Sequence, residues 1–356
     1  MRLVRIEHLR GDEILGKQLY DDTGRVLLSQ GVILTPFYIN KLKQLGINAL
    51  YIKDEISQEI VVEDNISEQT RQVSKAAIKD MMDRYSQHGK LHNEGIVKSV
   101  NAIIDDVLAT KDVMVNVAEI RSSSENLYTH SVNVTVLSTI LGIHMGYNQL
   151  RLKELAVGSI LHDIGKARIL LDKKELEKTR TQDEMNLYIQ QQHPKVGFEF
   201  LSHENFCSAV SKVAVLMHHE KVDGSGYPLH LTGKDINEVA KIVAVCNSFD
   251  NMVSGIGETG PMPVYQVLEY LVAMSGRFYD AEVVKRFIGN IAAFPTGSAV
   301  ILNTGERCLV IRQNQGMPMR PVVKVVYNKN GVPVNQSYEI DLEQELTQFI
   351  NQTIDM

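Results

Sequence analysis

The alternation of apolar and polar residues changes character along the chain and divides it into four predicted segments. The first, residues 1–64, is predicted to be a small α/β domain, because short β-branched runs such as residues 25–28 alternate with turn signals. A helix is predicted over residues 35–45, with Thr at its cap, Pro in its first turn and Gly46 after its end. Residues 48–52 predict a returning strand.

The middle of the chain has mainly helical periodicity. Residues 65–97 predict a helical connector with breaks at Gly89 and Gly95, and residues 98–292 predict a helical bundle. Apolar residues recur at helical spacing in six stretches of the bundle: 128–145, 153–161, 210–219, 236–252, 264–274 and 278–292.

The last segment, residues 293–356, changes to short β-branched runs and predicts a small β module. The runs are 298–302, 308–312, 321–327 and 334–340. The last two flank Asn330-Gly331, a pair typical of a hairpin turn. The predicted fold class is therefore multidomain and mainly α, with a helical bundle between a small N-terminal α/β domain and a small C-terminal β module.

Composition and charge narrow the class of protein. The 356 residues include 44% hydrophobic and 22% charged residues, as in soluble globular proteins. The net charge of −6 gives no basic field for nucleic acid or an anionic membrane, although a local positive site could bind a nucleotide. No long apolar segment follows residues 1–5, so we expect no signal peptide, and no apolar run reaches roughly 18 residues. The three scattered cysteines suit a reducing compartment. We therefore expect a cytoplasmic protein.

Histidines supply the candidate chemistry. Five of the eleven stand at or near the ends of predicted helices: His130, His162, His193, His218 and His219. One helical bundle can collect imidazoles from several helices, and a buried His162-Asp163 pair is costly unless a cation partners it. The pattern favours a metal site of nitrogen and carboxylate ligands, suited to Zn, Fe, Mn or Ni. Taken alone, His130 is more often a hydrogen-bonded core residue, and His193, before Pro194, is a helix start.

The stretch from His218 to Pro228, HHEKVDGSGYP, is the most distinctive in the chain. Its first half, two histidines and a carboxylate, suggests metal chemistry. Its second half predicts a tight loop, because two glycines permit unusual backbone angles and a proline fixes its own.

These motifs resemble those of the HD-GYP family, a branch of the HD phosphohydrolases. The resemblance rests on residues 128–134 (YTHSVNV), 162–166 (HDIGK) and 218–228, with a weaker match at 193–197 (HPKVG), and it covers about residues 98–292. It implies an all-helical domain with a two- or three-metal centre that hydrolyses cyclic di-GMP to a linear dinucleotide or to GMP.

The resemblance also implies roles for particular residues. The implied metal ligands are His130, His162, Asp163, His193, His218 and His219, with Asn247 at a doubtful further position. Asp163 would bridge two metal ions, which activate a water for in-line attack on phosphorus. Lys166 would stabilise the phosphate oxygens, although it could instead be a solvated lysine at a helix end. Gly226, Tyr227 and Pro228 would form a wall of the substrate pocket.

Three departures from the family pattern affect this expectation. Asn247 stands where the family has a ligand Asp, and Asp250 matches the second, non-ligand Asp. An amide brings no negative charge, so metal affinity should change. Residues 253–259 lack the basic residues that usually grip the nucleotide. Asn126 stands where three-metal members carry Glu, although Glu125 is adjacent, which favours two ions over three.

The leading hypothesis is therefore a cyclic di-GMP phosphodiesterase in second-messenger signalling. The alternative is a degenerate, weakly active or inactive HD-GYP protein that acts as a cyclic-dinucleotide receptor or a protein-interaction module. A third hypothesis is an HD hydrolase that acts on another phosphoester. The expected partners are a cyclic dinucleotide, a second copy of the chain and a signalling protein, but no nucleic acid and no membrane.

Overall fold

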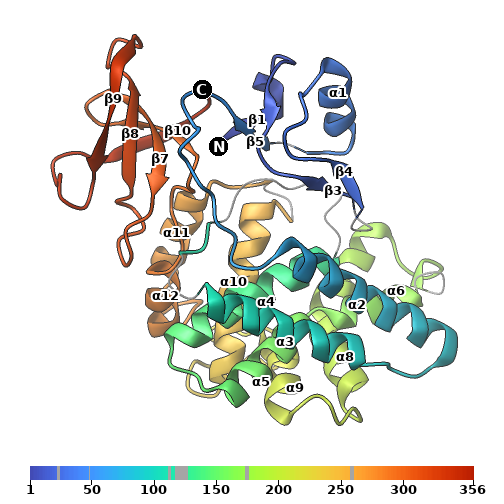
Figure 1. Cartoon of the computed structure of the whole chain (residues 1–356). Helices are drawn as coiled ribbons and strands as arrows, with labels where there is room; N and C mark the ends of the chain where they lie inside the picture. The colour runs from blue at the N-terminus through green and yellow to red at the C-terminus, as the bar shows by residue number, and fades with distance from the viewer. Residues whose placement is uncertain (22–24, 48, 111–113, 117–126, 173–175, 257–259) are drawn as a thin grey trace.

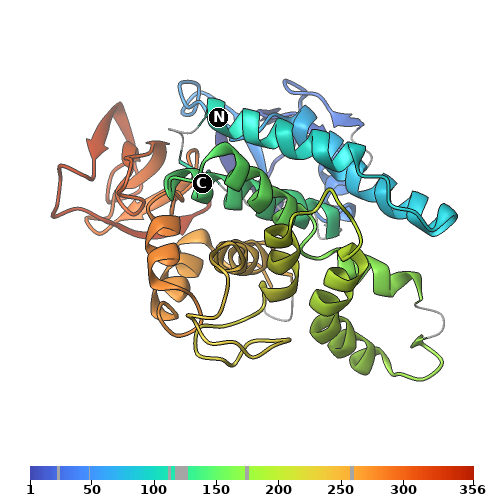
Figure 2. The ribbon, with the colours of Figure 1, turned by 90° about the horizontal axis from the view of Figure 1, so that it is seen from below.

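The structure is a computed structural model, and its main mass is a body of helices with small sheets toward one end (Figure 1). It describes residues 1–21, 25–47, 49–110, 114–116, 127–172, 176–256 and 260–356. The view from below shows the helices on the near side, with the N-terminal segment behind them (Figure 2). Within these residues, no helix is long and apolar enough to cross a membrane.

The N-terminal part contains small antiparallel sheets and one helix. Its elements are β1 (Arg2–Arg5), the 3-10 helix η1 (Ile6–His8), β2 (Ile14–Leu15), β3 (Leu19–Tyr20), β4 (Val26–Leu28), α1 (Pro36–Gln44) and β5 (Ala49–Lys53). The strand order is β1-β5-β2, with β3 and β4 as a separate pair. The Thr35 hydroxyl accepts a hydrogen bond from the Tyr38 amide, and Gly46 adopts a φ of 72° after the helix. The predicted capped helix and the returning strand are thus confirmed.

The helical body follows. Its helices are α2 (Glu68–His88), α3 (Glu94–Ala109), α4 (Leu127–His144), α5 (Gln149–Ile160), α6 (Ile164–Leu171), α8 (Gln182–Leu201), α9 (Ala209–Met217), α10 (Glu238–Ser254), α11 (Val264–Ala273) and α12 (Ala281–Ile288). Helix α4 is buried on all sides from His130 to Gly142, as expected of a central helix. The helix predicted over 278–292 is shorter, because the Asp280 side chain caps α12 and Gly289 follows its end.

Two predicted helix boundaries are wrong. Helix α2 ends at Gly89, with a φ of 66°, but Gly95 lies inside α3. A Cβ at Gly95 would lie 3.1 Å from the Ala77 Cβ, so this glycine lets α2 and α3 pack closely. His193 does not start a helix. It lies inside α8, which begins at a capping box formed by Thr181 and Glu184 and tolerates Pro194 in its interior.

One hydrophobic core joins the helical body to its neighbours. It contains Ile78 and Met81 of α2 and Val100 of α3 together with residues of α4, α5 and α10. Val323 of the C-terminal sheet belongs to the same core. Residues of the predicted connector therefore pack with the bundle, and α3 runs across residues 97 and 98. The domain boundaries after residues 64, 97 and 292 stay a prediction.

The C-terminal part is a small antiparallel sheet. Its strands are β6 (Ala299–Leu302), β7 (Arg307–Arg312), β8 (Val322–Tyr327), β9 (Pro333–Asp341) and β10 (Ile350–Ile354), in the order β10-β6-β7-β8-β9. The four predicted strands and the hairpin are confirmed, with a φ of 74° at Gly331. Strand β10, which pairs with β6, is missing from the prediction, because its central residues Asn351, Gln352 and Thr353 are all polar.

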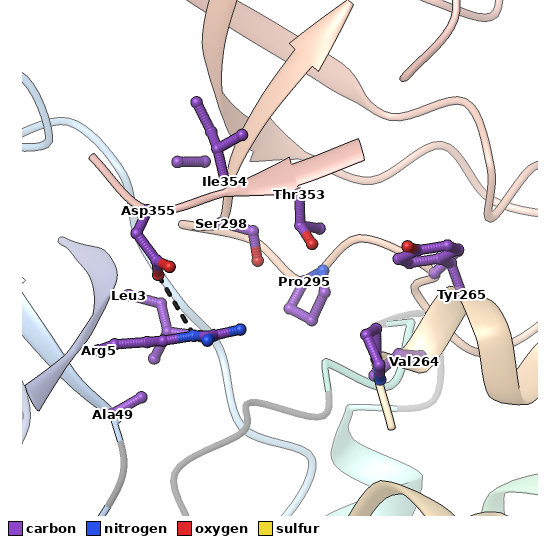
Figure 3. Close-up of a pocket in the computed structure, with 13 residues that line it drawn as sticks. Leu3, Arg5, Ala49, Val264, Tyr265, Pro295, Ser298, Thr353, Ile354 and Asp355 are labelled. Atoms are coloured by element: carbon purple, nitrogen blue, oxygen red, sulfur yellow. Dashed lines mark ion pairs between the residues drawn. The ribbon is translucent and has the colours of Figure 1, made fainter. Parts of the chain in front are cut away.

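The N-terminal and C-terminal sheets touch each other. The Leu3 amide donates a hydrogen bond to the Gly297 carbonyl at 3.0 Å, and a small apolar cluster joins residues of both parts. A small pocket lies where the two sheets meet α11 (Figure 3). At one end of this pocket the Arg5 Nε lies 3.5 Å from the Asp355 Oδ1, and Tyr265 of α11 lines another part. No histidine lines this pocket among the described residues.

Candidate metal centre

The structure brings five histidines together around one buried carboxylate, that of Asp163. They come from α4 (His130), the turn between α5 and α6 (His162), α8 (His193) and the end of α9 (His218 and His219). They form two groups that share Asp163, and within each group the candidate ligand atoms lie within 4.8 Å of one another. One group is Asp163, His193, His218 and His219, and the other is His130, His162 and Asp163.

The two oxygens of Asp163 face different groups. Its Oδ1 lies 3.1 Å from the His193 Nε2 and 3.7 Å from the His218 Nε2. Its Oδ2 lies 3.4 Å from the His162 Nε2 and 3.7 Å from the His130 Nε2. This carboxylate therefore stands between the two groups, with one oxygen toward each.

Two glycines let α6 and α8 approach closely enough to build this geometry. A Cβ at Gly165 would lie 2.0 Å from the His193 carbonyl oxygen and 2.7 Å from the Gly197 amide. A Cβ at Gly197 would lie 3.2 Å from the Gly165 amide. Only glycine fits such a contact, so the HDIGK segment places Asp163 next to His193.

Three imidazoles are oriented by backbone carbonyls. The pairs are His162 Nδ1 with Ser159 O (2.7 Å), His193 Nδ1 with Ile189 O (3.0 Å) and His218 Nδ1 with Val215 O (2.8 Å). A carbonyl accepts only from a protonated Nδ1, so each ring directs its Nε2 toward Asp163. Metal-ligating histidines are commonly oriented in this way.

His130 has a different environment. Its Nδ1 lies 2.7 Å from the Asp250 Oδ2, and its Nε2 lies 2.9 Å from the Asn247 Oδ1. The Asn251 Nδ2 also donates to the Asn247 Oδ1, at 2.9 Å. Asn247 thus lies at the edge of the cluster, with its side-chain oxygen already hydrogen-bonded. The contact between Asp250 and His130 was not anticipated from the sequence.

Burial and nearby charges favour the protonation states that metal binding needs at three of the histidines and at Asp163. Burial lowers the pKa of His218 to about 3 and also lowers the pKa of His162 and His219. Burial alone would raise the pKa of Asp163, but the Lys166 ammonium, 2.6 Å away, and the surrounding imidazoles hold it well below its usual range. These three imidazoles are therefore neutral beside an ionised carboxylate.

Unsatisfied polar atoms show that these residues fit a cation. The Asp163 Oδ1 and the His219 Nε2 are buried and have no hydrogen-bond partner among the residues that the structure describes. Buried polar atoms are rarely left in this state, because each costs free energy. Imidazole nitrogens around a carboxylate are a typical donor set for a divalent transition metal. The cluster could therefore hold a metal ion.

The loop from Glu220 to Leu231 forms one border of the cluster. The Tyr227 ring stacks on the His219 ring, with centroids 4.7 Å apart and planes 16° apart. A Cβ at Gly226 would lie 2.3 Å from the Lys221 amide, so the loop folds tightly there. Pro228 follows in a cis peptide bond.

Glu220 has a role that the sequence prediction missed. Its carboxylate accepts hydrogen bonds from the Leu229 amide (2.6 Å) and the Leu231 amide (2.9 Å), so it holds the loop and lies outside both candidate metal groups. The available signal was an acidic residue directly before a glycine-rich loop, because the backbone amides of such a loop need acceptors.

Two of the departures from the family pattern lie wholly or partly outside the described residues. One is the position of a possible third-metal ligand, Glu125 and Asn126, and the other is the end of the segment that lacks basic residues, 257–259. In the described part of the 253–259 segment, α10 ends at Gly255, which has a φ of 70°, and Ile256 is exposed.

Two regions of the chain match known protein families. Residues 114–283 match the HD domain family, and residues 299–356 match a KOW domain associated with HD domains. The chain is 26% identical over 246 residues to a cyclic di-GMP phosphodiesterase of Pseudomonas aeruginosa, covering 69% of this chain and 58% of the relative. It is 36% identical over 167 residues to a cyclic di-GMP phosphodiesterase of Thermotoga maritima, covering 45% and 44%.

A third relative is named for another cyclic dinucleotide. It is a 3'3'-cGAMP-specific phosphodiesterase of Vibrio cholerae, 28% identical over 207 residues, which cover 57% of this chain and 39% of the relative. The chain spans about half the length of these relatives. From the histidine and aspartate motifs, the GYP loop and these matches, we conclude that the chain carries an HD domain of the HD-GYP type over residues 114–283.

Proposed function

We propose that this chain is a metal-dependent phosphodiesterase that hydrolyses cyclic di-GMP to a linear dinucleotide or to GMP in second-messenger signalling. The observation that carries the proposal is the buried Asp163 carboxylate, which faces imidazole nitrogens on both sides and keeps one oxygen without a hydrogen bond among the described residues. The names of two relatives support cyclic di-GMP as the substrate. A cytoplasmic setting suits this substrate and the three buried free cysteines.

The proposal assigns the ligands to two ions. Asp163 would be shared, with His193, His218 and His219 around one ion and with His130, His162 and Asn247 around the other. Bound divalent ions supply a hydroxide at neutral pH and offset negative charge on phosphoryl oxygens.

The chain's own residues would orient the substrate and stabilise charge. The Lys166 side chain is 27% exposed and its Nζ lies 2.6 Å from the Asp163 Oδ2, so its ammonium stands between the buried cluster and solvent. From there it would donate hydrogen bonds to the non-bridging phosphate oxygens as their charge grows. Gly226, Tyr227 and Pro228 would form the adjacent wall, which Glu220 holds in place.

An anaerobic hydrolysis assay tests this proposal. The protein is loaded with Mn(II) or Fe(II) and given cyclic di-GMP or 3'3'-cGAMP, and the products are separated by chromatography. We expect a linear dinucleotide or GMP from cyclic di-GMP, and no product after a chelator is added. Asp163→Asn and Lys166→Ala should lower the rate by about 100-fold or more, whereas Lys285→Ala, on the exposed face of α12, should not.

The second candidate function is a cyclic-dinucleotide receptor that does not hydrolyse its ligand. It is favoured by Asn247, whose side-chain oxygen is hydrogen-bonded to His130 and Asn251. Metal-loaded protein that binds cyclic di-GMP in calorimetry but forms no product would replace the phosphodiesterase proposal with this one.

A further inference from the structure

We infer that this chain binds its two metal ions with very different affinities. The tight site consists of Asp163, His193, His218 and His219. The weak site consists of His130, His162, Asp163 and Asn247. The inference rests on the proposed function in one respect, because both require a metal centre at Asp163. It goes further by ranking the two sites from contacts that differ between them.

The tight site has two uncommitted donor atoms, and its His193 Nε2 and His218 Nε2 lie 3.2 Å from each other. It offers three imidazoles and one carboxylate oxygen, which is a full tetrahedral set. Within the described part of the chain, the Asp163 Oδ1 and the His219 Nε2 accept and donate no hydrogen bond. The His193 and His218 rings are already turned inward by backbone carbonyls. An ion that enters this site breaks few existing interactions.

The donors of the weak site are already engaged. The Asn247 Oδ1 lies 2.9 Å from the His130 Nε2 and 2.9 Å from the Asn251 Nδ2. Both contacts must be lost or lengthened before this oxygen and the His130 nitrogen can bind one ion. The Asp163 oxygen that faces this site, Oδ2, accepts a 2.6 Å hydrogen bond from the Lys166 ammonium. A fixed cation therefore competes for the carboxylate on this side.

Charge acts in the same direction. The two sites share one carboxylate, that of Asp163, and their other donors are neutral. The Lys166 ammonium lies 2.6 Å from the Asp163 Oδ2, so it offsets the negative charge on the side of the weak site. The second ion must also share Asp163 with the first, and two divalent cations a few ångströms apart repel each other. Fewer negative ligands mean lower affinity for a divalent cation.

A manganese titration tests the inference without measuring activity. The full chain is stripped of metal and titrated with Mn(II), and the free ion is followed by electron paramagnetic resonance. The ions retained after gel filtration are counted by mass spectrometry. For the wild type we expect two binding phases with Kd values at least about 10-fold apart, and about one retained ion per chain.

Two variants connect the weak phase to the contacts described above. Asn247→Asp restores a carboxylate and should lower the second Kd by about 10-fold or more, so that two ions are retained. Asn251→Ala removes one hydrogen bond to the Asn247 oxygen and should lower the second Kd by a smaller factor. His130→Ala in the Asn247→Asp background should return the count to one, whereas His219→Ala in the wild type should remove the tight phase.

Two results would overturn the inference. One is a wild type that retains two ions with indistinguishable Kd values, which would leave the proposed phosphodiesterase standing. The other is a folded Asn247→Asp variant with an unchanged second Kd. Circular dichroism checks the fold, and if this variant does not fold, the wild-type titration alone decides. A wild type that retains no ion would overturn both the inference and the proposed function.

Discussion

At the scale of single residues, Asp163 determines what the cluster can do. Its two oxygens lie in unlike surroundings, since Oδ1 faces His193 and His218 without a hydrogen bond in the described structure, and Oδ2 accepts from Lys166. Burial would normally favour the protonated acid, yet the nearby cation and imidazoles keep the carboxylate ionised. A buried anion of this kind is stable only with partners, and a bound cation is the strongest of them.

The buried histidines predict how the stability of the metal-free protein depends on pH. The pKa of His218 is about 3 when folded, against an ordinary value of 6.5, so the unfolded chain takes up the proton first as pH falls below 6.5. His162 and His219 shift in the same direction. We expect the metal-free protein to lose about 1.4 kcal/mol through His218 at one pH unit below 6.5, and a further amount in the same direction through His162 and His219.

Thermal unfolding between pH 7.5 and pH 5.5 measures this loss. The Tm of the metal-free wild type should fall with pH, and His218→Gln should give a shallower fall because one of the groups is gone. An equally steep fall in this variant, or a flat wild-type curve, would contradict the assignment.

The residues of the histidine cluster were largely predictable, but the contacts of their neighbours were not. His162-Asp163 and His218-His219 are pairs of adjacent residues that a purely structural role rarely requires. The sequence alone therefore indicated them as candidate metal ligands. Two contacts depend on how the chain folds, which no local pattern encodes. One is the hydrogen bond that a loop amide donates to Glu220, and the other is the contact between Asp250 and His130.

At the scale of elements, the centre depends on how closely α6 approaches α8. Gly165 of α6 lies against the backbone of α8 at His193, and a Cβ there would lie 2.0 Å from a carbonyl oxygen. The helix contact and the metal centre are therefore coupled through one glycine. The same approach carries His193 to within 3.1 Å of Asp163.

Gly165→Ala should therefore damage both stability and the cluster. We expect the free energy of unfolding to fall by about 3 kcal/mol, because the added methyl forces α6 and α8 apart. Gly289→Ala is the matched control, since its Cβ would meet nothing closer than 3.8 Å and its φ is −60°. Chemical denaturation of both variants tests this, and equal stabilities would contradict the close contact.

Helices with strong end signals were predicted well, and elements without them were not. Thr35, Gly46 and Gly89 marked true helix ends. The start of α8 was misplaced because a His-Pro step resembles a helix start, whereas the capping box at Thr181 lies well upstream. The central residues of strand β10 are polar and carry no apolar strand pattern, so the strand forms through its pairing with β6.

At the scale of the whole molecule, the helical body and the C-terminal sheet share a core and should unfold together. Val323 of β8 is fully buried in the cluster that also contains residues of α2, α4 and α10. Val323→Ala should lower the Tm of one common transition, with a loss of about 2 kcal/mol. Val332, which is 54% exposed, gives the control Val332→Ala. Separate calorimetric transitions for the two parts would contradict a shared core.

Anomalous diffraction from crystals of the manganese-loaded protein tests whether a metal centre lies around Asp163. We expect a strong anomalous peak among Asp163, His193, His218 and His219, at coordinating distance from all four, and a weaker peak beside His130 and His162. Loaded crystals with no peak at Asp163, or with manganese bound only elsewhere in the chain, would contradict it.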